Sequence, residues 1–195
     1  MGTATSRSAA AGLAALALAL AGCGSATHSS SDAAKAAPFG WLRPASPPAG
    51  WSAVRIPGGA VMSYPPGWVR IGGDPGTASA ASFDSAHHFV GYLNITPRQS
   101  QETLAGWAHF RVAHNAEEND RNITTLAVGT GLRFRAGRGS CVRDSYTTAA
   151  GASYIEVACL VAGPRSSVVI VGASPPKNWA RTAPLLERAI SSMLA

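Results

Sequence analysis

Charged residues are scarce in this 195-residue sequence and make up 13% of it, about half of the ~25% that is usual for a soluble domain. The hydrophobic share of 46% excludes a long disordered or coiled-coil chain. Beyond the amino terminus there is no run of 18 consecutive apolar residues, so no membrane-spanning helix is expected. The composition fits one domain of ordinary size.

Hydrolase signatures are also missing. The sequence has no Gly-x-Ser-x-Gly motif, which would place a serine on a nucleophile elbow. The ten acidic residues are scattered, whereas glycosidase chemistry needs two carboxylates facing one cleft. Gly129-Thr130-Gly131 is too short for a dinucleotide loop. We therefore expect a non-enzymatic domain without catalytic residues or a cofactor.

The five histidines leave one alternative open. His87 and His88 follow Asp84 in a predicted turn, but adjacent strand residues point to opposite faces and a closed metal site needs three or four ligands. We expect no metal site there. The alternative function is an exported hydrolase or cell-wall-modifying enzyme that uses Asp84 and His88.

The amino terminus has an apolar run at residues 9–20, preceded by Arg7. Its length is typical of the hydrophobic region of a signal peptide. The run ends in Leu20-Ala21-Gly22-Cys23, which resembles the lipobox of bacterial lipoproteins. This resemblance implies that residues 1–22 are a signal peptide and that Cys23 carries the lipid. The acyl chains would anchor the protein to the cell membrane, outside the cytoplasm.

Cys141 and Cys159 would then lie in an oxidising compartment. If residues 149–151 form a three-residue hairpin loop, with Gly151 in the left-handed conformation, these two cysteines face each other across the ladder. Directly opposed residues are close enough for a disulfide. We predict a Cys141–Cys159 disulfide.

The same register has one unfavourable consequence. It pairs Tyr146 with Tyr154, which is favourable, and Asp144 with Glu156, which is not, because like charges repel across a ladder. The register therefore requires compensation from Arg143 or from a neighbouring strand.

Residues 23–49 are rich in Ser, Ala, Pro and Gly and lack periodicity, which predicts a flexible tether. Phe39, Trp41 and Leu42 interrupt this composition. They dock either on the domain or at the bilayer interface, and the sequence does not distinguish the two.

The globular part is predicted to span residues 50–195. Helices are expected at residues 100–116, with Ser100 as the cap, and after Pro175-Pro176, with an apolar stripe of Trp179, Leu186, Ala189, Ile190 and Met193. Strand patterns occur at residues 54–56, 60–64, 68–71, 77–83, 89–96, 123–134, 140–148, 153–161 and 167–173. The last four strands are typical of an antiparallel meander. Together they predict an α+β fold, a mostly antiparallel sheet flanked by two helices.

The segment Val-Met-Ser-Tyr-Pro-Pro-Gly-Trp at residues 61–68, with this order of elements, resembles the PsbP-like family, which includes LpqN-type lipoproteins. The resemblance implies an α/β/α sandwich with a binding or scaffold role, for an envelope protein or a small ligand. A pocket between the sheet and the first helix, lined by Trp107 and Phe110, would indicate a small hydrophobic ligand. A filled interface would indicate recognition by the surface.

The net charge of +6 raises the question of an acidic partner. The densest basic patch consists of Arg133, Arg135, Arg138 and Arg143. Only Phe134 is interleaved, so no stacking platform for bases is visible and no nucleic-acid partner is expected. A solvated strand is the simplest interpretation, and an acidic partner or anionic lipid head groups are the alternatives.

Overall fold

The computed structural model describes residues 37–99 and 101–195. Cys23, the predicted signal peptide and the first part of the predicted tether lie outside these residues. Among the described residues, no helix is both long and apolar enough to cross a bilayer. The elements are β1 (Ser52–Arg55), β2 (Val61–Tyr64), β3 (Val69–Ile71), β4 (Ala78–Phe83), β5 (Phe89–Pro97), α1 (Trp107–Glu117), β6 (Arg121–Phe134), β7 (Gly137–Thr147), β8 (Ser153–Ala162), β9 (Ser167–Ser174) and α2 (Pro176–Ser192).

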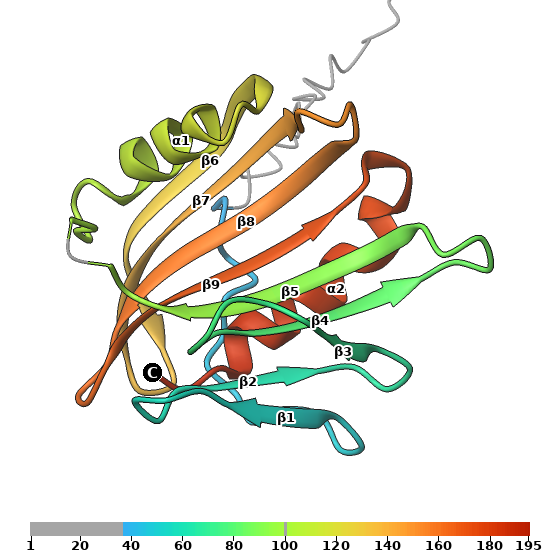
Figure 1. The fold of residues 1–195 in the computed structure, drawn as a ribbon. Coiled ribbons are helices and arrows are strands. Elements are labelled where there is room, and N and C mark those ends of the chain that lie inside the picture. Colours follow the sequence, from blue (N-terminus) through green and yellow to red (C-terminus); the bar gives the residue numbers. More distant parts are fainter. Residues whose placement is uncertain (1–36, 100) are drawn as a thin grey trace, which may run out of the picture. The chain divides into compact units, whose positions relative to one another are not determined.

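Antiparallel pairing builds one seven-stranded sheet in the order β3-β4-β5-β9-β8-β7-β6 (Figure 1). The strands β6 to β9 form the predicted meander, and β5 pairs with β9 on the other side. The short strands β1 and β2 form a separate two-stranded sheet. The expected α+β fold with a mostly antiparallel sheet is confirmed.

The two helices cover opposite faces of the large sheet (Figure 1). Alternate residues of a strand point to opposite faces, so the strands contribute side chains to one core on each face of the sheet. The predicted stripe of α2 packs on one face, where Leu186, Ala189 and Ile190 are fully buried. Trp107 of α1 packs on the other face, against Val142, Ala158 and Leu160.

The helix α1 begins at Trp107 instead of residue 100. The predicted cap, Ser100, lies outside the described residues. In the segment before Trp107, two side chains accept hydrogen bonds from nearby backbone N–H groups. The Glu102 carboxylate accepts the Gln99 N–H at 2.6 Å, and Thr103 Oγ1 accepts the Gly106 N–H at 3.0 Å. Such local bonds compete with helical ones, which explains the later start.

The compact unit spans Ala36–Ala195 instead of beginning at residue 50, so residues 37–49 belong to it. Phe39 is buried in the same cluster as α2, with Trp41 and Leu42 against it. A Cβ built at Gly129 would lie 2.6 Å from Phe39 Cδ2, so glycine makes room for this ring. Of the two alternatives, these aromatic residues therefore dock on the domain.

The β7–β8 hairpin has the predicted register. Gly151 adopts the left-handed conformation, with φ of 86°, and Tyr146 opposes Tyr154. Cys141 opposes Cys159, and the two are joined by a disulfide. Asp144 opposes Glu156, so the structure contains the like-charge pair and must compensate for it.

Candidate ligand-binding site

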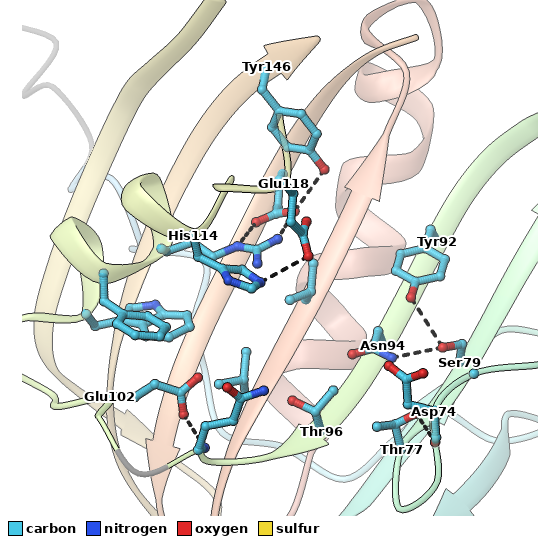
Figure 2. Close-up of a pocket in the computed structure, with 18 of the residues that line it drawn as sticks. Asp74, Thr77, Ser79, Tyr92, Asn94, Thr96, Glu102, His114, Glu118 and Tyr146 are labelled. Atoms are coloured by element: carbon cyan, nitrogen blue, oxygen red, sulfur yellow. Dashed lines mark hydrogen bonds and ion pairs between the residues drawn. The ribbon is translucent and has the colours of Figure 1, made fainter. Parts of the chain in front are cut away.

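The helix α1 covers only one half of its face of the sheet. It contacts β6, β7 and β8 most extensively, and beside it the residues of β9, β5 and β4 on the same face line a hollow. The result is a groove with a volume of about 470 Å³, open along one side of α1 (Figure 2). Its floor carries Val169, Val171, Tyr92, Asn94, Thr96 and Ser79.

The floor is polar where β4 and β5 meet. Asn94 Nδ2 donates to Ser79 Oγ at 2.9 Å, and Ser79 Oγ lies 3.3 Å from the Tyr92 hydroxyl. Ser79 and Asn94 are cross-strand partners, so the sheet itself holds this network in place. Figure 2 shows these three side chains on one side of the groove and His114 and Glu118 on the other.

The wall consists of stacked rings along α1. The ring centroids of Trp107 and Phe110 are 6.0 Å apart, and those of Phe110 and His114 are 6.1 Å apart. Trp107 Nε1 donates to the Ala158 carbonyl at 2.9 Å, which satisfies its buried N–H and holds α1 on β8. Of the two alternatives that the sequence leaves open, a pocket beside Trp107 and Phe110 is present, and its floor is polar as well as apolar.

A buried ion pair closes one end of the groove. Arg111 donates to both oxygens of Glu156, from Nε at 2.7 Å and from the terminal nitrogen at 2.8 Å. The Tyr146 hydroxyl donates to Glu156 Oε2 at 3.1 Å. Glu156 is only 1% exposed, so these bonds replace the water that its charge loses.

Arg111 also supplies the positive charge that compensates the Asp144–Glu156 pair. The prediction that Arg143 or a neighbouring strand supplies it was wrong. Arg143 precedes Asp144 on β7 and therefore points to the other face. The cation comes instead from a helix that is remote in sequence. Burial alone would lower the pKa of Arg111, but the charge of Glu156 and the bonds to it outweigh burial and raise that pKa.

Asp144 is 0% exposed, and neither carboxylate oxygen has a hydrogen-bond partner. Burial and then the charge of Glu156 raise its pKa to about 7, although Arg111 opposes this shift. A neutral Asp144 avoids both the repulsion and the cost of a buried unpaired charge.

The groove is acidic although the chain is basic. Its lining includes the carboxylates of Asp74, Glu102, Glu118 and Glu156 against one permanent cation, Arg111. Burial raises the pKa of Glu102 above its ordinary value. Because Arg111 is already paired with Glu156, the remaining groups favour a cationic ligand over an anionic one.

The sequence-predicted pair Asp84 and His88 lies elsewhere, in the exposed β4–β5 turn. Asp84 Oδ1 accepts the N–H groups of Ala86 and His88, and Asp84 Oδ2 lies 3.3 Å from His88 Nδ1. The His88 N–H is the main reason why the pKa of Asp84 is lowered. Neither side chain lines the groove. Within the described ranges, no three His, Cys, Asp or Glu side chains gather as a metal site.

Two further sequence features have structural explanations. Ser174 and Lys177 have Ser-x-x-Lys spacing, but Ser174 is fully buried and its hydroxyl donates to the Val90 carbonyl at 2.7 Å. In the arginine patch, Arg133 and Arg138 are cross-strand partners, Arg135 bonds the Ser192 carbonyl at 3.1 Å, and Arg143 lies partly buried.

Sequence comparison finds no family model and no curated protein that match. Among solved structures, cyanobacterial PsbP (CyanoP) from Synechocystis is 13% identical over 74% of this chain and 92% of that chain, with a TM-score of 0.53. The fold is therefore PsbP-like. Mog1 is 16% identical over 73% of this chain and 87% of its own, with a TM-score of 0.48. Mycobacterium tuberculosis LpqN, described as involved in cell envelope biogenesis, is 11% identical over 82% of this chain and 98% of its own, with a TM-score of 0.40.

Proposed function

We propose that this chain is a lipid-anchored protein of the bacterial cell envelope, and that its domain binds a small polar ligand in the groove between α1 and β3–β5 without transforming it. One observation carries the binding role: the groove beside α1 presents polar groups that the fold already holds in place. Groups that are ordered before binding lose little entropy when a ligand arrives.

The chemistry of the groove favours binding over catalysis. Ser79, the serine on the floor, bonds to Asn94 and Tyr92, and neither is a general base. The Glu156 carboxylate is occupied by Arg111 and Tyr146. Asp84 and His88, on which the enzymatic alternative depends, are exposed outside the groove, so no observation favours a hydrolase.

The anchor rests on the lipobox resemblance at Leu20-Ala21-Gly22-Cys23. Residues 24–36 separate Cys23 from the packed domain, and a chain of that length can reach at most roughly 45 Å. The groove would thus be held near the outer face of the membrane.

Anchoring is tested by fractionating cells that express the wild type, Cys23→Ala or Ser25→Ala as a matched control. We expect Cys23→Ala to lose acylation, and wild type treated with the signal-peptidase inhibitor globomycin to keep its signal peptide uncleaved. The variant should leave the membrane fraction, whereas Ser25→Ala should stay. Unchanged membrane retention of Cys23→Ala contradicts the anchor.

Ligand binding is tested by native mass spectrometry of protein purified from its own membranes. Thr96 is half-buried on the groove floor, so Thr96→Trp fills the groove. Thr130→Trp makes the same change at an exposed site on β6 outside it. We expect a small molecule on wild type and Thr130→Trp but not on Thr96→Trp. Identical spectra for all three proteins contradict the groove.

A further inference from the structure

A second, smaller hollow adjoins the groove and is lined by aromatic rings. It has a volume of about 160 Å³ and shares Tyr92 and Tyr146 with the groove. We call it the aromatic cage, and its lining residues are Phe89, Tyr92, Tyr146, Tyr154 and Ala173. The cage is thus the aromatic end of the site proposed above.

The sheet register creates this hollow. Ala173 on β9 is the direct partner of Tyr92 on β5, and Tyr146 on β7 is the partner of Tyr154 on β8. The methyl group of Ala173 leaves space that the surrounding rings do not fill. The Tyr146 and Tyr154 centroids are 6.1 Å apart, and those of Phe89 and Tyr92 are 6.4 Å apart at 87°.

One ring of the cage is open to solvent, and the three tyrosine rings are half-buried. Phe89 is 38% exposed, and Phe83 packs against it at 4.8 Å while 37% exposed. Exposed apolar clusters on a soluble domain commonly mark a binding surface. The faces of aromatic rings carry negative electrostatic potential, which attracts cations that have shed part of their hydration.

Negative charge adjoins the cage. Glu156 on β8 is the other direct partner of Ala173, and it accepts a hydrogen bond from Tyr146, a ring of the cage. A phenol that donates to a carboxylate has a more electron-rich ring and attracts a cation more strongly. Arg111 compensates the charge of Glu156, so the uncompensated negative charge of the site comes from the other carboxylates that line the adjoining groove, Asp74, Glu102 and Glu118.

We propose that the aromatic cage binds the alkylated ammonium group of a ligand whose polar remainder lies in the groove. The inference rests on the proposed binding function and names its ligand class. A trimethylammonium group has the properties that this site matches, since its methyl groups contact apolar rings while its charge interacts with ring faces and nearby carboxylates. A wholly apolar ligand would gain nothing from the carboxylates.

The test compares choline with 3,3-dimethylbutan-1-ol, a neutral molecule of the same shape, by calorimetric titration of the full mature chain. Charge is the only major difference between the two probes. We expect choline to bind at least tenfold more tightly. Equal affinity for the two probes overturns the proposal, because it shows that the positive charge does not contribute to binding in the hollow.

Paired substitutions locate the effect. Tyr154→Leu removes one ring of the cage, whereas Tyr154→Phe keeps it. We expect about a tenfold loss of choline affinity for the leucine variant and little change for the phenylalanine variant. Phe89→Leu, at an exposed ring, provides a second test that does not depend on the core. Equal choline binding by wild type and both leucine variants overturns the cage.

The two proposals fail separately. If choline does not bind, the cage proposal is overturned, whereas a small molecule lost only from Thr96→Trp would still support the groove. If the wild type and Thr96→Trp carry the same molecules, the proposed function fails whatever choline does.

Discussion

Replacing Asp144 by asparagine should stabilise the protein increasingly as the pH rises from about 4 to 7. The folded chain holds this carboxyl at 0% exposure beside Glu156, with a pKa raised from 3.8 to about 7. Between these two pH values the folded state binds a proton that the unfolded state has released, so stability falls as the pH rises. The difference corresponds to about 4 kcal/mol once the pH exceeds 7.

Asparagine has nearly the same shape and no charge, so Asp144→Asn removes this penalty. We expect both proteins to be equally stable near pH 4. The variant should gain progressively up to pH 8, by as much as about 4 kcal/mol. Urea unfolding at a series of pH values, followed by tryptophan fluorescence, measures the difference. Titrating groups remote from Asp144 are common to both proteins and cancel.

Asp74→Asn is the matched control, because Asp74 lies on the exposed rim of the groove. It should show no comparable gain. Parallel stability curves for the wild type and Asp144→Asn would refute the argument, and so would a gain that is already complete at pH 4.

Three further predictions concern the contacts that hold the domain together. Arg111→Leu leaves Glu156 buried without its cation and should cost about 3–5 kcal/mol at pH 7; adding Glu156→Gln should restore much of that loss in urea unfolding. The Cys141→Ser, Cys159→Ser double variant should lose about 3 kcal/mol, or about 10 °C in Tm, and reductant should then have no effect. Phe39→Ala should cost about 3 kcal/mol in the same assay if the amino-terminal segment is part of the core; a loss below about 0.5 kcal/mol would mean that this segment is not.

Local patterns predicted most of the fold. The β7–β8 hairpin follows from residue counting around Gly151, because a three-residue loop determines every opposed pair on both strands. The stripe of α2 follows from helical spacing alone. The start of α1 was missed because Glu102 and Thr103 bond the backbone locally, and no periodicity records that competition.

The groove was beyond local patterns. Ser79, Asn94, Arg111 and Glu156 come from three strands and a helix that the sheet topology brings together, and no motif connects them. One signal was present: the opposed Asp144 and Glu156 required a cation in their vicinity. The sequence could not identify Arg111 as that cation, because the packing of α1 on the sheet determines the contact.

The central claim, that the groove holds a ligand, is tested most directly by an experimental structure of the protein isolated from its own membranes. We expect a bound organic molecule between α1 and β5, with its cationic end among Phe89, Tyr92, Tyr146 and Tyr154. A groove that contains only water, or α1 packed down on β5 so that no groove exists, would contradict it.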